Sequence, residues 1–180
     1  AEIHTDPFLG KGTVVASIVE STSPSLNAVP DSCTLYLDRR LTFGETKESA
    51  IEALQALPGA EHVEFQEMWY DTPSYTGYVY EVDKYFPAWA IPEGDPIVQA
   101  GADTTHELWS KRARVGRWSF STNGIYWAGK AGIPCIGFAP SNEVYAHTVL
   151  DQVPIEDVVR STEFYALFPA MLGEELRRRG

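Results

Sequence analysis

One histidine of this sequence lies where a chemically active side chain would be expected. His147 is in the segment 141–153, between an apolar run at 134–138 that is typical of a central strand and a helix that we expect from Pro154 onward. The loop between a core strand and a helix is where α/β proteins place functional groups, and neutral imidazole is a common zinc ligand. On position alone, a solvated surface histidine is the simpler interpretation.

A second candidate is the turn Ser121–Gly124 (STNG), which precedes a predicted helix over 125–131. There Gly124 would let a ligand approach the backbone, and the first N–H groups of the helix would face an anion or a carbonyl oxygen. We expect this turn and His147 at the same carboxyl edge of a sheet. One histidine does not complete a zinc site, which needs three or four ligands, and the chain has no HExxH or CxxC motif.

Composition excludes several classes of partner. The 180 residues include 14 lysines and arginines against 25 aspartates and glutamates, a net charge of -11. Nucleic acids and anionic membranes attract clustered positive charge, so we expect neither as a partner. The cysteines, Cys33 and Cys135, lie in apolar runs, which favours buried free thiols and suits a reducing compartment. With no apolar run of about 20 residues and no signal pattern, we expect a cytoplasmic protein.

Other catalytic groups are weaker candidates. The chain has no G-x-S-x-G nucleophile elbow, so Ser121 and Ser141 are poor candidates for a nucleophile. Cys135, in an expected core strand, is predicted to be inert. The remaining histidines lie in polar stretches or near turns and are expected to be solvated: His4, His62 and His106.

The first 70 residues are predicted to form a small α+β unit. Strands are expected at 13–19 and 33–38, then a helix capped by Thr46, then a third strand at 63–66. One helix can hardly cover three strands, so a further β-α pair would be needed to complete a ferredoxin-like layer. The sequence supplies no such pair, and we expect the domain to begin upstream of the first residue.

Two further segments follow along the chain. Residues 71–94 are an aromatic and proline-rich connector that we expect to lack regular structure, and to be either docked on its own protein or part of an interface. The pattern over 95–180 then alternates: helix 96–112, strand 115–120, helix 125–131, strand 134–138, and a helix from 154 that Pro169 should end. Such alternation predicts a parallel or mixed sheet between helix layers, so the expected fold class is α/β joined to α+β.

Three motifs together indicate a family resemblance. They are NAVPDSCTLYLDRRL at 27–41, STNGIYWAGKAGIPCIGF at 121–138 and EVYAHTVLDQVP at 143–154. In order and spacing they resemble the C-terminal part of the zinc metallohydrolases that include acetylornithine deacetylase, succinyl-diaminopimelate desuccinylase and aminoacylase, and within them the selenium-metabolism hydrolase branch most. The resemblance implies an amide hydrolase, a deacylase or metallopeptidase acting on N-acyl amino acids or small peptides, with two zinc ions that activate water and polarise a carbonyl.

The resemblance also implies roles for domains and residues. Residues 1–70 would be most of a ferredoxin-like lid that mediates homodimerisation, and 95–180 the C-terminal part of an α/β/α catalytic domain. His147 matches a zinc ligand, and Arg40 matches the arginine that binds the substrate carboxylate. The residues implied to contact the substrate besides Arg40 are Asn27, Asn123 and Gly124.

The match to the family is incomplete in two respects. Leu150 and Asp151 stand where this branch usually has asparagine and glutamate after the histidine, so the resemblance does not extend to those two positions. The other zinc ligands, the catalytic glutamate and the lid histidine are implied to lie upstream of the first residue. The N-terminal half of the same enzyme would then be a required partner, and this chain would supply no catalytic residue and at most one zinc ligand.

Two other interpretations stay open from the sequence. The chain would be a non-catalytic dimerisation or interaction module, in which free strand edges pair between copies. Alternatively, it would be the product of a decayed or split gene. The sequence does not identify the acyl group or the amino acid that the complete enzyme would release.

Overall fold

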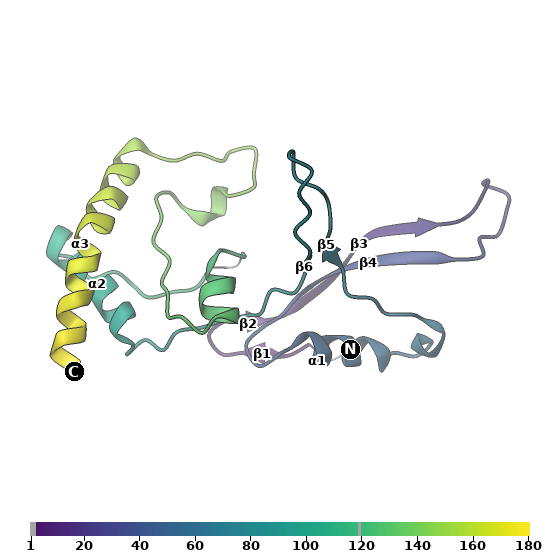
Figure 1. Ribbon diagram of the computed structural model, residues 1–180, viewed down its shortest axis with the longest axis horizontal. Coiled ribbons are helices and arrows are strands. Elements are labelled where there is room, and N and C mark those ends of the chain that lie inside the picture. Colours follow the sequence, from purple (N-terminus) through teal and green to yellow (C-terminus); the bar gives the residue numbers. More distant parts are fainter. Residues whose placement is uncertain (1–2, 119) are drawn as a thin grey trace. The chain divides into compact units, whose positions relative to one another are not determined.

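The structure is a computed structural model that describes residues 3–118 and 120–180. The chain divides into two compact units, Ala1–Ala88 and Trp89–Gly180. In the described residues the strands all belong to the first unit and pair antiparallel, and the two longest helices, α2 and α3, belong to the second (Figure 1). The fold is therefore α+β.

A long antiparallel hairpin is the largest element of the first unit. It joins β3 (Thr13–Ser21) to β4 (Cys33–Arg40). Both segments are rich in β-branched and apolar residues, which favour a pleated extended backbone. The predictions of strands at 13–19 and 33–38 are confirmed, and each strand extends two residues further.

α1 (Lys47–Gln55) begins after Thr46, as predicted. The Thr46 hydroxyl accepts a hydrogen bond from the Ser49 amide and the Ser49 hydroxyl accepts one from the Thr46 amide, which forms a reciprocal capping box. In the first turn, Lys47 donates to Glu67 at 2.9 Å and lies over the ring of Tyr85. The start of the helix is therefore fixed both by its cap and by contacts with later residues.

The strand predicted at 63–66 is not formed. α1 is followed by a short helical turn, η1 (Ala60–His62), and then by irregular chain. Val63 and Phe65 do alternate with polar residues, as in a half-buried strand. A strand also needs a neighbouring strand to satisfy its backbone hydrogen bonds, and the described residues offer none to this segment.

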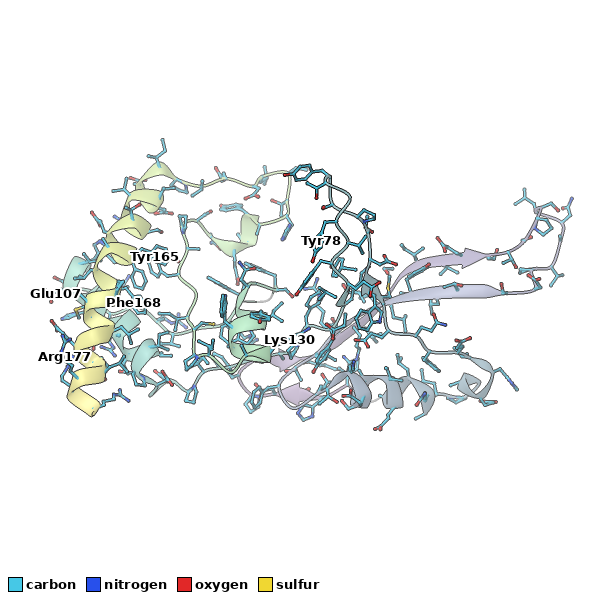
Figure 2. All side chains as sticks on the ribbon, viewed as in Figure 1. Tyr78, Glu107, Lys130, Tyr165, Phe168 and Arg177 are labelled. Carbon is cyan, nitrogen blue, oxygen red and sulfur yellow. The ribbon has the colours of Figure 1, made fainter. Side chains whose placement is uncertain are left out.

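Two short hairpins complete the first unit. β1 (Thr5–Asp6) pairs with β2 (Gly10–Lys11). β5 (Trp69–Tyr70) pairs with β6 (Val82–Asp83) at the base of an exposed loop that carries Tyr78, labelled in Figure 2. Apart from β6, residues 71–94 contain no helix or strand, as predicted.

The core of the second unit lies between α2 (Pro96–Trp109) and α3 (Ile155–Arg179) (Figure 1). α2 begins as predicted, because the Asp95 carboxylate accepts from a backbone amide of the first turn and Pro96 takes the first helical position. No helix in the described part of the chain is both long and apolar enough to cross a membrane.

Aromatic rings fill the space between these helices. Phe164 of α3 is 1% exposed and stacks on Phe138, with ring centroids 3.9 Å apart. Phe168, one helical turn further along α3 (Figure 2), stacks on Phe164 at 5.3 Å. A Cβ at Gly101 of α2 would lie 2.5 Å from the Ile136 side chain, so the missing side chain makes room for Ile136 beside these rings.

α3 passes through Pro169, where the sequence predicted its end, and extends to Arg179. Beyond the proline, the buried Glu175 forms an ion pair with Arg178 at 3.3 Å. It also accepts a hydrogen bond from Arg179 at 2.6 Å. Arg179 also donates to the Gly94 carbonyl oxygen at 2.8 Å. Contacts on both sides of the proline therefore outweigh the one backbone hydrogen bond that it removes.

The sheet predicted for 95–180 is not formed in the described residues. No strand partner is found for residues 134–138 or for the described part of 115–120, which leaves out Ser119. The indole of Trp118 lies on Gly137, where a Cβ would meet a ring carbon at 2.2 Å. A central strand needs backbone partners on both sides, so an apolar sequence alone does not make one.

Both units leave a large apolar surface in contact with solvent. The accessible area of the chain is 13340 Å², whereas two compact domains of about 10 kDa each would expose roughly 10,500 Å² together. Val15, Ile18 and Val19 of β3 are all more than half exposed. The chain as a whole therefore exposes more surface than compact domains of this size, and part of that surface is apolar.

We predict that Phe164→Ala lowers the free energy of unfolding of the 180-residue chain by about 3–5 kcal/mol, because it leaves a cavity between α2 and α3. Val159→Ala, at a side chain 53% exposed on the same helix, should cost no more than about 0.5 kcal/mol. Urea unfolding followed by circular dichroism measures both. Equal losses in the two variants would contradict this description of the core.

Candidate functional site

His147 is carried by a loop whose two ends are tied together. The Ser141 hydroxyl donates to the Gln152 carbonyl oxygen at 2.6 Å and closes the base of the loop. Within it, the Asn142 side chain caps the helical turn η3 (Glu143–Tyr145) by accepting from a backbone amide of that turn at 3.1 Å. The segment is a compact loop ordered by its own hydrogen bonds, of the kind that frequently carries function.

The backbone at His147 is in the left-handed region, with φ of 62°. Thr148 stabilises it: its amide and its hydroxyl both donate to the Tyr145 carbonyl oxygen, at 3.2 and 2.8 Å. The imidazole is exposed, and the ring of Phe120 meets it edge-on with centroids 6.4 Å apart. Non-glycine residues held in this conformation are concentrated at functional sites. The loop therefore presents the imidazole to solvent from an ordered backbone.

The STNG turn leads into η2 (Ile125–Lys130), a π-helical turn. The Gly124 amide donates to the Thr122 hydroxyl at 3.2 Å, and the Ile125 amide donates to the Thr122 carbonyl oxygen at 3.1 Å. The expectation that these N–H groups would be free to bind an anion is therefore wrong, because Thr122 already satisfies both.

Gly124 is required for packing in this structure. Its φ of -58° is ordinary, but a Cβ would meet the indole of Trp89 at 2.3 Å. The missing side chain thus makes room for a tryptophan ring in the space where a ligand was expected to approach. Asn123 is exposed and its carbonyl oxygen accepts from the Tyr126 amide at 3.1 Å. Substrate contacts of Asn123 and Gly124 stay predictions.

Arg40 is the last residue of β4, in the first unit. Its side chain is 62% exposed, and its Nε lies 3.8 Å from the carboxylate of Asp38, which is on the same face of the strand. An exposed pair at this distance contributes roughly 0–1 kcal/mol. The contact with Asp38 alone therefore holds the guanidinium only weakly.

Asn27 lies at the tip of the β3–β4 hairpin. The Ser23 hydroxyl donates to the Ala28 carbonyl oxygen at 2.8 Å and helps to order this loop. Asn27 is exposed, and the apolar side chains beside it, Leu26 and Val29, are almost fully exposed too. The tip is thus an ordered loop with an apolar surface around a polar side chain, and the substrate contact expected of Asn27 stays a prediction.

The described residues contain no cluster of three or more histidine, cysteine, aspartate or glutamate side chains able to hold a metal ion. One His-x-Asp pattern, His4–Asp6, was not among the metal ligands predicted from the sequence. Asp6 accepts from the amides of Phe8 and Leu9 at 2.8 and 2.6 Å, so it serves the turn between β1 and β2. A zinc ion at His147 would need two or three further ligands.

The two cysteines are free, and only Cys135 is partly buried. Burial of Cys33 was expected and is wrong, because β4 is exposed on both faces at this end. Burial raises the pKa of the Cys135 thiol, and a hydrogen bond to the Ala128 backbone offsets part of the shift. The thiolate population at neutral pH falls accordingly, which agrees with the prediction that Cys135 is inert.

Comparison with known proteins finds relatives but no family. No family model matches this chain. Over 166 residues, 91% of its length, the chain is 42% identical to a protein of Escherichia coli strain K12 and to one of Escherichia coli O157:H7, each named uncharacterized protein YgeY. The chain spans 41% of the length of these relatives. Their names state no activity, so any function has to be argued from the residues.

We predict that iodoacetamide labels Cys33 before Cys135. Because the pKa of Cys135 is raised, its labelling rate should keep rising from about pH 7 to beyond about pH 9, where an ordinary thiol is mostly ionised. Mass spectrometry of the Cys33→Ser variant isolates the Cys135 rate. Labelling of Cys135 at the rate of free cysteine at neutral pH would contradict this assignment.

Proposed function

We propose that these 180 residues belong to a zinc-dependent amide hydrolase, a deacylase or peptidase acting on N-acyl amino acids or small peptides. In this proposal His147 is a zinc ligand and Arg40 binds the substrate carboxylate. The observation that carries it is the state of His147, an exposed imidazole on a left-handed residue of a hydrogen-bonded loop. A metal ligand has to be held in place before the metal arrives, and this loop does so.

The chemistry of the residues suits these roles. Neutral imidazole is a normal zinc ligand, and bound zinc supplies an activated water and polarises the scissile carbonyl. The guanidinium of Arg40 offers a planar pair of donors that matches a carboxylate. The exposed position of Arg40 at a strand end suits recognition of an amino-acid carboxylate.

Further polypeptide would complete the site in this proposal. The relatives are more than twice as long as this chain, the total accessible area of the chain exceeds that of compact domains of its size, and both units carry exposed large hydrophobic residues. On α3, Ile155, Val159 and Leu176 are exposed on the side away from the buried Phe164, so the helix is apolar on two faces. A ferredoxin-like lid and an α/β/α catalytic domain would form once that surface and the unpaired apolar segments are covered.

A non-catalytic interaction module is the second candidate. The exposure of all nine residues of β3 favours it, because an exposed apolar hairpin suits pairing with another chain, including a second copy. Under this interpretation His147 has no metal to bind. The two candidate functions therefore make different predictions for one side chain, the imidazole of His147.

We predict that His147→Ala in the complete protein lowers kcat/KM for amide hydrolysis by more than about 100-fold, because a zinc ligand is lost. Elemental analysis should show a matching loss of zinc. His62→Ala, at an exposed histidine of η1, is the matched control and should change neither. Unchanged zinc content and hydrolysis in His147→Ala would favour the interaction module.

We also predict that the 180-residue chain alone neither hydrolyses N-acyl amino acids nor retains stoichiometric zinc on gel filtration, because one histidine cannot hold the ion. Mixing with a separately produced upstream half should restore both properties. Stoichiometric zinc together with amidase activity in the chain alone would overturn the proposed division of the site.

A further inference from the structure

We propose that Arg39 is a positioning residue for Arg40. Its largely buried guanidinium locks the end of β4 and the loop that follows, so that Arg40 is presented to a substrate carboxylate from a fixed backbone. This inference rests on the carboxylate-binding role proposed for Arg40. The two adjacent arginines would then have separate tasks, one structural and directed inward, the other directed at the ligand.

The two side chains point to opposite faces of the strand, as neighbours in β-structure must. The Arg40 side chain is 62% exposed, whereas that of Arg39 is 13% exposed. Arg39 pairs with Glu45, whose side chain is 9% exposed. A guanidinium kept this far from water is retained only with its hydrogen bonds satisfied, so its partners indicate what it fixes.

Two of those partners are backbone carbonyl oxygens at the end of the hairpin. Nη1 of Arg39 donates to the Thr13 carbonyl oxygen at 3.2 Å and to the Arg40 carbonyl oxygen at 3.1 Å. Thr13 and Arg40 are directly opposite each other in the last pair of the β3–β4 ladder. One guanidinium therefore holds both strands at the point where Arg40 leaves the sheet.

Glu45 extends this restraint to the loop after the strand. While one oxygen of its carboxylate pairs with Arg39, the other accepts from the Thr42 amide at 2.8 Å. Thr42 is itself buried, and its hydroxyl donates to the Gly10 carbonyl oxygen at 2.8 Å. The backbone is thus held at Arg40 itself, together with its ladder partner Thr13, and again two residues later at Thr42.

Gly12 shows how tightly the cluster is packed. A Cβ at this residue would lie 2.8 Å from the Arg40 carbonyl oxygen and 2.9 Å from both Arg39 Nη1 and Glu45 Oε2. Only a residue without a side chain lets the backbone lie against all three groups. We name Gly12, Arg39, Thr42 and Glu45 the Arg39–Glu45 cluster.

Fixing the backbone matters for binding because bidentate recognition of a carboxylate is directional. The charge of Arg40 survives if the Arg39–Glu45 cluster loosens, but its orientation toward the ligand does not. Loss of Arg39 should therefore weaken binding of carboxylate substrates selectively. A role limited to stability would instead affect all substrates alike.

The test uses the complete protein and two matched probes, an N-acyl amino acid and its carboxamide analogue. Arg39→Lys and Glu45→Gln should each raise KM for the carboxylate probe about 10-fold, with kcat within about 2-fold, and leave the carboxamide unchanged. Arg40→Met should remove the preference for the carboxylate. The double variant Arg39→Met, Arg40→Met should show the same ratio of kcat/KM for the two probes as Arg40→Met alone, since both residues act through the contact of Arg40 with the carboxylate. Glu20→Ala, which removes the exposed acceptor of the Tyr36 hydroxyl on the same hairpin, is the control.

Each result has a distinct meaning. Selective loss for the carboxylate in the Arg39 and Glu45 variants supports the positioning role. Equal losses for both probes, or loss of stability without any change in preference, would overturn it while leaving Arg40 as the carboxylate ligand. No selective effect of Arg40→Met would show that the proposed carboxylate role itself is wrong, and the inference would fall with it.

Discussion

Backbone hydrogen bonding limits what this chain can build. Each strand in its described residues has one partner strand, and each sheet is a two-stranded hairpin. A two-stranded hairpin cannot cover its own faces, so β3 stays exposed along its whole length. The apolar segments near Trp118 and Gly137 lie against each other through a side chain without forming a ladder. The exposed apolar surface of the β3–β4 hairpin follows from this shortage of partners.

Polar contacts nevertheless order two segments of the backbone. In the second unit, Ser141, Asn142 and Thr148 fix the loop that presents His147. In the first unit, the Arg39–Glu45 cluster fixes the strand end that presents Arg40. In both cases the presented side chain is exposed while the side chains that support its backbone make specific hydrogen bonds. Such organisation of supporting groups around an exposed group is what a binding site requires.

Local signals in the sequence predicted local structure well. The cap at Thr46, the start of α2 at Asp95 and the two long strands follow from side chains adjacent in sequence. The failures at 63–66 and 134–138 depend on a distant strand partner, which no local pattern specifies. The continuation of α3 through Pro169 depends on tertiary contacts of Phe164 with Phe138 and of Arg179 with Gly94, which overrode a strong local signal.

The candidate site was predictable only in part for the same reason. His147 and Arg40 could be named from motifs, but the strained backbone of the first and the supporting Arg39 of the second are three-dimensional facts. The one sequence signal that separates the two arginines was the alternation of apolar and polar residues in β4, which puts Arg39 on the face of Leu37 and Arg40 on the face of Asp38. The packing of Trp89 on Gly124 had no sequence signal at all, since the residues are far apart in the chain.

The central claim is that His147 binds zinc in the complete protein. Anomalous diffraction at the zinc absorption edge, on crystals of that protein, tests it most directly. A zinc peak about 2.0–2.1 Å from a ring nitrogen of His147 is the predicted result. Zinc bound elsewhere in the protein, with the imidazole of His147 outside its coordination sphere, would contradict the account.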